Sequence, residues 1–286
     1  MKRFFAKYGL LFPGMGIYLV FKIIPMLQSL YVSLFSWDGL SPKKTFVGFS
    51  NYVSFFSDPV SLLALANTFR WMVFSLTLPL GLGFFLAVSL DRKMAGKTVF
   101  RSIFYIPTVL PLITLGVIWG WIFNPSYGAL NVFLRSMGLS SVARSWLALP
   151  ETATWALMVP ALWRNCGLPM VLFLAGLQNI PDELYEAATI DGARGIHRFF
   201  HITIPGLVET FIIVTSLLVV DSLRLFDLIY VMTWGGPGRS TQVLATWMYF
   251  NTFAYYKAGY GSAISWILTV LSVVIIYPYI KIMSEK

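Results

Sequence analysis

The chain has 286 residues, of which 57% are hydrophobic and only 12% are charged, and its formal net charge is +9. Soluble domains carry roughly 25% charged residues, so this composition cannot cover a water-facing surface. The positive charge does not indicate nucleic acid as a partner, because Lys and Arg also collect in the cytoplasmic loops of membrane proteins. The only cysteine, Cys166, excludes a disulfide within the chain.

Six apolar segments approach or exceed the ~20 residues that cross a bilayer as a helix. They cover residues 8–35, 71–90, 103–123, 153–177, 204–220 and 258–280. We therefore expect an all-α polytopic membrane protein with six transmembrane helices. The first segment follows a basic start but lacks a small-residue cleavage pattern, so it is interpreted as an uncleaved span. Residues 1–64 would form this span and an extracytoplasmic loop, and residues 65–281 a domain containing spans 2–6.

The distribution of basic residues predicts the orientation, because Lys and Arg are retained on the cytoplasmic side. With the N-terminus inside, the inner basic residues are Lys2, Arg3, Lys7, Arg92, Lys93, Lys97, Arg101, Arg194, Arg198, Lys281 and Lys286. The outer ones are fewer: Lys43, Lys44, Arg70, Arg135, Arg144, Arg239 and Lys257. We expect both termini and the polar stretch 181–205 to be cytoplasmic.

Motifs for catalysis or for a cofactor are weak. Residues 91–98, DRKMAGKT, end like a phosphate-binding loop but lack its first glycine and its strand–helix context, so they are interpreted as a basic turn. His197 and His201 are spaced four apart, without the acid of a metalloprotease helix. We expect no catalytic residue, no metal site and no cofactor, and the energy for transport would come from an ion or another subunit.

Polar residues at membrane depth are costly and usually face a bundle interior or an aqueous cavity. The strongest candidates interrupt the fourth and fifth spans and are Trp163, Arg164, Asn165, Asp221, Ser222 and Arg224. Tryptophan can stack on sugar rings, while Arg, Asn and Asp supply fixed hydrogen bonds. These residues are predicted to line a translocation cavity. A structural salt bridge between Arg164 and Asp221 is the alternative, and it can coexist with that cavity.

The stretch 181–205 is too long and too patterned for a simple connection. Acidic residues at its start favour the positive end of a helix dipole, and Gly192 is typical of a helix end. Pro205 would open the fifth span. The pattern predicts a short helix, a glycine turn and a second helix, which could dock into a groove on a partner.

The same stretch carries a family resemblance. Glu186-Ala187-Ala188 is followed after three residues by Gly192 and after nine more by Ile202-Thr203-Ile204-Pro205. This spacing resembles the EAA signature of permease subunits of binding-protein-dependent ABC importers, with Ile204 in place of the usual leucine. Longer segments resemble the carbohydrate branch, the relatives of maltose and glycerol-3-phosphate permeases. They are FRSIFYIPTVLP at 100–111, LAGLQNIPDELYEAATIDGA at 174–193 and DSLRLFDLIYVMTWGGPGRST at 221–241.

The resemblance implies a type I ABC importer transmembrane fold in the cytoplasmic (inner) membrane. It implies a heterodimer with a homologous second permease, an ATPase subunit dimer and an extracytoplasmic solute-binding protein. The residues expected to couple to the ATPase are Glu186, Ala187, Ala188, Asp191, Gly192, Ile202 and Pro205. The cargo would be a sugar or oligosaccharide, and a polyol or glycerol phosphoester remains the alternative within this class. An ion-coupled secondary transporter and an intramembrane enzyme are the alternatives of other classes.

Overall fold

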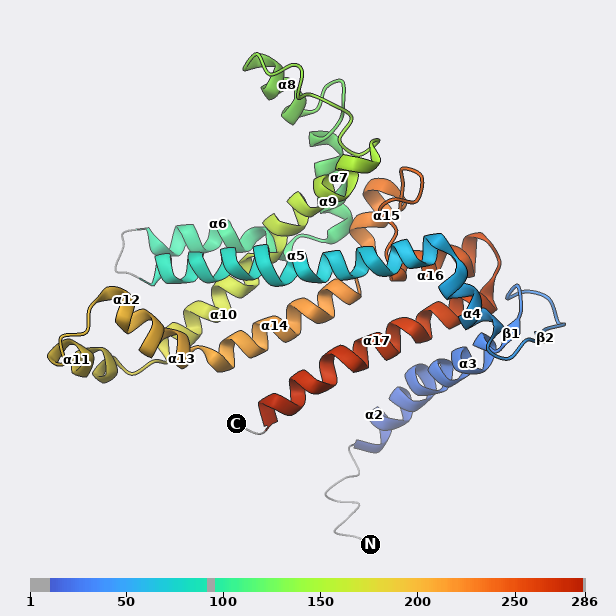
Figure 1. Cartoon of the computed structure of the whole chain (residues 1–286), viewed down its shortest axis with the longest axis horizontal. Helices are drawn as coiled ribbons and strands as arrows, with labels where there is room; N and C mark the ends of the chain where they lie inside the picture. Colours follow the sequence, from blue (N-terminus) through green and yellow to red (C-terminus); the bar gives the residue numbers. More distant parts are fainter. Residues whose placement is uncertain (1–10, 92–95, 285–286) are drawn as a thin grey trace, which may run out of the picture. The chain divides into compact units, whose positions relative to one another are not determined.

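The computed structural model describes residues 11–91 and 96–284 (Figure 1). Four of its helices are long and apolar enough to cross a membrane, or up to six if each of two bent helix pairs counts as one span. The all-α polytopic prediction is confirmed. Among the basic residues used for the orientation, Lys2, Arg3, Lys7, Arg92, Lys93 and Lys286 lie outside the described residues, as does part of the 91–98 turn.

The chain divides into two units, and the first combines residues up to Leu62 with Trp247–Leu271. A first candidate span, Phe12–Ser33, consists of α2 (Leu11–Tyr18), η1 (Leu19–Ile23) and α3 (Ile24–Ser33). After it come β1 (Phe35–Ser36), β2 (Thr45–Phe46) and the short helix α4 (Ser50–Ser57). The π-helical turn η3 (Phe250–Ala254) and the first part of α17 (Ala258–Ser284) complete this unit.

Backbone contacts join the end of α3, helix α4 and the start of α17. The Asn51 side-chain amide donates hydrogen bonds to the Ser33 and Phe35 carbonyls, at 2.8 and 2.9 Å. The Gly259 amide donates to the Trp37 carbonyl at 3.1 Å. A Cβ at Gly259 would overlap the Phe35 carbonyl, so only glycine permits this approach. The loop expected after the first span is fixed by these contacts.

A polar network begins helix α5 (Pro59–Leu90). Asp58 accepts hydrogen bonds from the Val60 and Ser61 amides, both at 3.2 Å, and from the Ser61 hydroxyl at 2.6 Å. The Trp247 indole N–H donates to Ser61 Oγ at 2.8 Å, and Tyr260 Oη lies 2.7 Å from the same oxygen. Burial raises the pKa of Asp58, but the donated hydrogen bonds outweigh burial and hold the pKa below its usual value.

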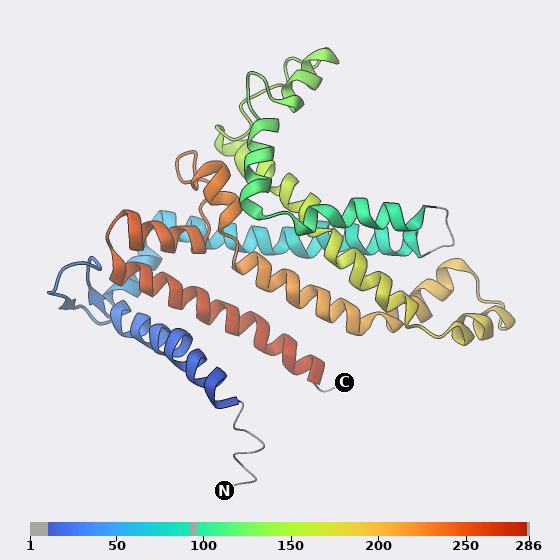
Figure 2. The ribbon, with the colours of Figure 1, turned by 180° about the vertical axis from the view of Figure 1, so that it is seen from behind.

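The second unit contains Leu63–Thr246 and the end of α17. Its remaining elements, in chain order, are α6 (Lys97–Val109), α7 (Leu112–Ile122), α8 (Ala129–Ser136), α9 (Pro150–Asn165), α10 (Gly167–Gln178), α11 (Asp182–Ile190), α12 (Gly195–Arg198), η2 (Phe199–Thr203), α13 (Ile204–Gly206), α14 (Val208–Leu223), α15 (Asp227–Thr233) and the start of α16 (Leu244–Tyr249), which ends in the first unit. Both views place α11–α13 where α10 and α14 meet (Figures 1 and 2).

Two expected span boundaries were wrong. Helix α5 begins at Pro59 rather than at residue 71, because Asn67 and Thr68 are buried within the helix instead of facing water. The Asn67 amide donates to the Ser240 and Gln242 carbonyls, at 2.7 and 2.8 Å, so its burial is compensated.

The expected third span, residues 103–123, is not one straight helix. Helices α6 and α7 meet at 100°. Leu110 adopts an extended conformation with ψ 134°, because the residue before a proline disfavours the helical region. The fifth span is also bent: α12–α13 and α14 meet at 62°, and the long helix begins at Val208 rather than at Pro205.

Close packing holds α10 against α5 and α6. Gly83 on α5 leaves no room for a Cβ, which would lie 2.5 Å from Pro169 Cβ. A Cβ at Gly167 would overlap Thr108 Oγ1 and lie 2.6 Å from the Phe104 carbonyl oxygen. Cys166, at the junction of α9 and α10, is buried in this contact. On α7, Gly116 lies against Val231, whereas a Cβ at Gly120, one turn further along, would meet nothing within 4 Å.

An aromatic cluster links three helices of the second unit. Phe84 of α5, Phe173 of α10 and Phe211 of α14 contact one another, with ring centroids 4.6–5.2 Å apart. Leu174, Leu177, Leu207 and Val214 are buried around these rings. Aromatic pairs of this kind contribute about 0.5–1.5 kcal/mol beyond the area that they bury.

The glycine contacts yield a stability prediction. Gly167→Ala should lower the free energy of unfolding by about 1–3 kcal/mol, because the added methyl group overpacks the contact with α6. Gly120→Ala is the matched control and should be neutral or slightly stabilising, since its new Cβ meets nothing. The measurement is the thermal unfolding of both variants in the same detergent. Equal unfolding temperatures for the two variants would contradict the packing argument.

Candidate functional site

The stretch 181–205 begins with a helix that ends in a defined capping motif. Helix α11 is followed by Asp191 and then by Gly192, whose φ is +76°. The Gly192 amide donates to the Thr189 carbonyl at 3.1 Å, and the Ala193 amide donates to the Ala188 carbonyl at 2.8 Å. This pair of bonds is the Schellman motif, which requires a left-handed residue at the position of Gly192. The spacing between Glu186-Ala187-Ala188 and Gly192 is therefore the length of one capped helix end.

The second half of the stretch returns the chain to the membrane domain. Helix α12 continues into the π-helical turn η2, where the Ile204 amide bonds to the Phe199 carbonyl. Thr203 is buried, and its hydroxyl lies 3.0 Å from Tyr185 Oη on α11. Arg198 Nη1 donates to Thr189 Oγ1 at 3.1 Å. These two bonds hold the two halves of the stretch together, and the bend at Leu207 then redirects the chain into α14.

One side of the stretch is packed on the membrane helices. Tyr185 and Ile202 are half-buried against the core cluster around Phe173. Phe199 lies 6.0 Å from Phe84 between ring centroids. Gly206 allows a close approach, because a Cβ there would lie 2.9 Å from Ile180 Cδ1. A displacement of this stretch would therefore be resisted by side chains of α5, α10 and α14.

The other side of the stretch is uncovered. Glu186, Ala187, Asp191, Gly192 and Pro205 are exposed, while Ala188 and Ile202 are half-buried. A hollow of about 590 Å³ runs between α11 and α12, with Ala188, Asp191 and Gly192 in its lining together with the basic residues Arg194, His197 and Arg198.

Two apolar side chains on this uncovered side were not among the predicted residues. Ile190 and Ile196 are 87% and 76% exposed. Exposed isoleucines on both sides of the glycine turn are typical of a surface that a partner protein covers. A signal was present in the sequence, since both residues flank the Gly192 turn in an otherwise polar run.

A second site lies within the membrane helices, where α9 gives way to α10. A cavity of about 270 Å³ is lined by Arg164 and Asn165 from this break and by Asp221 and Arg224 from the end of α14. Arg164 Nη1 donates to Asn165 Oδ1 at 3.0 Å, and Asn165 Nδ2 donates to Asp221 Oδ2 at 3.4 Å. Instead of the expected direct Arg164–Asp221 salt bridge, two successive hydrogen bonds link Arg164 to Asp221 through the Asn165 side chain.

The cavity retains unused hydrogen-bonding capacity. Arg164 Nε is buried without a partner among the described atoms. Asp221, in the last turn of the apolar helix α14, and Arg224, at its C-cap, are exposed in the isolated chain. Because charged side chains at membrane depth face aqueous cavities or other subunits, these groups are available to water, solute or a second chain.

The structure separates two predicted residues from this cavity and adds one. The Trp163 ring contacts Trp119 at 6.0 Å between centroids, outside the cavity lining. Ser222 is buried, and its hydroxyl donates to the Val219 carbonyl at 2.7 Å. Thr108 of α6 does line the cavity and donates to the Arg164 carbonyl at 2.8 Å. Its only signal in the sequence is its place between Pro107 and Pro111.

A larger and mostly apolar groove, of about 700 Å³, lies between α5 and the start of α9. Arg70, Glu151 and the exposed Trp155 are among its lining residues. No group of three or more His, Cys, Asp or Glu side chains within the described residues could hold a metal ion.

Comparison with known proteins places this architecture in a family. The binding-protein-dependent transport system inner membrane component family matches residues 80–282. The trehalose/maltose transport system permease protein MalF of Thermococcus litoralis is 38% identical over 277 residues, which cover 95% of this chain and 92% of the relative. The probable ABC transporter permease protein YurN of Bacillus subtilis is 36% identical over 258 residues, covering 90% and 88%.

Solved structures agree at the level of the fold. A bacterial ABC transporter involved in the import of the acidic polysaccharide alginate has a chain that matches with a TM-score of 0.86 and 21% identity. The match covers 99% of this chain and 96% of that one. A second structure, of a bacterial alginate ABC transporter in complex with an alginate pentasaccharide-bound periplasmic protein, matches with a TM-score of 0.86 and 22% identity, covering 97% and 93%.

The family match covers most of the chain, and the relatives align over nearly its whole length. Both identify a permease component of an ABC transporter rather than an ion-coupled secondary transporter. The chain belongs to the binding-protein-dependent transport system inner membrane components, as a permease component of an ABC transporter.

Proposed function

We propose that this chain is one of two transmembrane subunits of an importer for a sugar or oligosaccharide. Relatives named for trehalose/maltose, sulfoquinovosyl glycerol and multiple-sugar transport support the class of cargo. A homologous second permease would complete the pathway, and an extracytoplasmic solute-binding protein would deliver the solute, as the periplasmic protein in the alginate complex suggests. The chain would lie in the cytoplasmic membrane with both termini in the cytoplasm.

ATP hydrolysis would take place on a separate ATPase dimer, so that this chain has no catalytic role. The observation that carries this proposal is the two-sided character of residues 181–205. Their outer side exposes Ile190, Ile196 and the hollow beside Gly192, which would receive the ATPase. Their inner side packs on the aromatic cluster through Ile202 and Tyr185. Closure of the ATPase dimer would move this element, and the helices joined by the cluster would follow.

The cavity at the α9–α10 break would form part of the translocation pathway. Arg164, Asn165, Asp221 and Arg224 would contact the solute there. Trp163 and Ser222 remain proposed members of the pathway at a second position, beside the cavity rather than in its lining.

One observation favours the alternative cargo, a glycerol phosphoester or another anionic solute. The cavity lining contains two guanidinium groups, Arg164 and Arg224, against one carboxylate, Asp221. Guanidinium groups bind phosphate and carboxylate through paired hydrogen bonds. Uptake of a phosphoester that competes with sugar uptake in the reconstituted importer would support this alternative.

Gly192 provides a test of the coupling role. Gly192→Phe should abolish uptake and weaken association with the ATPase, because the side chain would project into the proposed docking surface. A Cβ at Gly192 meets nothing within 4 Å inside this chain, so a clash within the permease would not explain the loss. The measurements are solute uptake and the amount of ATPase that copurifies.

The control separates backbone strain from contact with the partner. Gly192→Asn keeps a residue that tolerates a left-handed conformation, so it should retain most ATPase association. Normal uptake by the Gly192→Phe variant would count against this role for the stretch.

The cavity is tested by Asn165→Ala and Asp221→Ala. Each variant should lower uptake about tenfold, which corresponds to the loss of one hydrogen bond to a charged group, while assembly and basal ATPase activity stay unchanged. Asp227→Asn is a matched control, because Asp227 is an exposed acid on the following helix outside the cavity lining. Uptake at the wild-type rate by both cavity variants would contradict the assignment of this cavity to the translocation pathway.

A further inference from the structure

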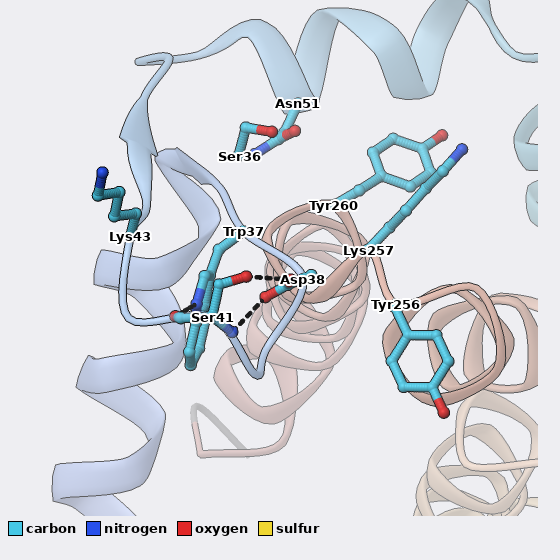
Figure 3. Close-up of a pocket in the computed structure, with 9 residues that line it drawn as sticks. All are labelled: Ser36, Trp37, Asp38, Ser41, Lys43, Asn51, Tyr256, Lys257 and Tyr260. Carbon is cyan, nitrogen blue, oxygen red and sulfur yellow. Dashed lines mark hydrogen bonds between the residues drawn. The ribbon is translucent and has the colours of Figure 1, made fainter.

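A separate hollow in the first unit has no role in the proposed transport pathway. It measures about 370 Å³ and lies between the β1–β2 loop and the junction of η3 with α17 (Figure 3). Trp37, Asp38 and Lys43 line it from the loop. Tyr256 and Lys257 line it from the junction. Its lining is therefore rich in aromatic and cationic side chains.

The position of the hollow relative to a bilayer follows from the helices that meet there. The candidate span Phe12–Ser33 ends beside it, and the candidate span Ala258–Pro278 begins beside it. The Asn51 bonds to Ser33 and Phe35, together with the Gly259–Trp37 bond, hold these two ends at one level. Since both helices leave the hydrocarbon at that level, the hollow lies where lipid headgroups lie.

The charges of the hollow favour an anion. Within the described residues, the Lys43 and Lys257 ammonium groups have no hydrogen-bond or ion-pair partner. The Asp38 carboxylate is already used: it accepts hydrogen bonds from the Ser41 hydroxyl and from the Ser41 and Leu40 amides, at 2.8 and 2.9 Å for the amides. These bonds, led by that of the Ser41 hydroxyl, lower the pKa of Asp38 to about 2. Asp38 therefore remains charged but has little capacity left for either lysine.

The neighbouring lysine differs from these two. Lys44 Nζ lies 4.8 Å from the centroid of the Tyr31 ring, 5.5 Å from that of Phe35 and 5.6 Å from that of Trp37. Its charge is thus engaged by aromatic faces. Aromatic rings and lysines at one level are typical of the membrane–water interface.

An uncovered apolar face beside the hollow decides between a lipid and a soluble acidic partner. Phe49, at the N-cap of α4, and Val53 and Phe56 on α4 are 74%, 64% and 61% exposed, and they follow one another at the i, i+4, i+7 spacing of one helix face. Phe46 on β2 is 66% exposed. A short helix with such a face, lying between two membrane spans, matches an interfacial helix whose apolar side enters the acyl boundary.

We infer that this hollow attracts the headgroup of an anionic phospholipid, with Lys43 on one side of the hollow and Lys257 on the opposite side supplying the positive charge (Figure 3), while the exposed apolar face at α4 contacts the acyl chains. Trp37 and Tyr256 flank the headgroup with amphipathic rings. The lipid would fix the level of the first and last spans in the membrane, a role separate from solute passage.

The test uses the importer purified with its partner subunits and reconstituted in nanodiscs of phosphatidylglycerol and phosphatidylcholine. Native mass spectrometry counts the phosphatidylglycerol molecules that remain bound. Removing one lysine charge near a membrane surface should weaken binding about fivefold. Lys43→Gln and Lys257→Gln should each show this loss, and the double variant should lose the bound lipid at concentrations where the wild type retains it.

Lys44→Gln is the matched control. It removes the same charge from the residue next to Lys43, but the ammonium group of Lys44 faces aromatic rings. Unchanged retention in this variant supports a defined site, whereas an equal loss would indicate diffuse attraction and overturn it. Displacement of the lipid by soluble glycerol 3-phosphate would also overturn the inference, since the site would then bind a free anion. Unchanged lipid retention in the double variant would overturn the inference as well. This includes the case in which the double variant loses affinity for the solute-binding protein instead.

Discussion

The contact among Phe84, Phe173 and Phe211 is the interaction on which the rest of the membrane domain depends. It joins α5, α10 and α14 at the base of the 181–205 stretch, and Tyr185 and Ile202 of that stretch pack against the same cluster. Protein interiors are close-packed and transmit displacement with little compression. Under the proposed coupling role, movement of the 181–205 stretch would therefore be transmitted to three membrane helices through this cluster.

The two units differ in how completely their buried polar groups are hydrogen-bonded. In the first unit, Asp58, Ser61 and Tyr260 satisfy one another beside the Trp247 indole, so this network stabilises a fixed arrangement. In the second unit, the cavity at the α9–α10 break leaves Arg164 Nε without a partner. Incomplete pairing is costly in a low-dielectric interior, so a partner for this atom would come from water, a solute or a second chain.

The sequence predicted the helical class, the capped helix at Gly192 and the grouping of Arg164, Asn165, Asp221 and Arg224 around one cavity, because spacing and charge at membrane depth are local signals. It did not predict the 100° bend at Leu110, since prolines in membrane helices are often tolerated without a break. The expected second span began too late because its uncharged run starts only after Arg70, whereas the helix begins at Pro59 and buries Asn67. Its partners, the carbonyls of Ser240 and Gln242, are more than 170 residues away, and such distant compensation has no local signature.

The network around Ser61 also constrains the order in which the chain can fold. Ser61 and Tyr260 are 199 residues apart, and their hydroxyls meet only after the last helix has been made. At a synthesis rate of roughly 5–20 residues per second, Ser61 waits roughly 10–40 s for this partner. During that interval Asp58 and Ser61 lack their distant contacts, so the first unit is completed late although most of its residues are synthesised first.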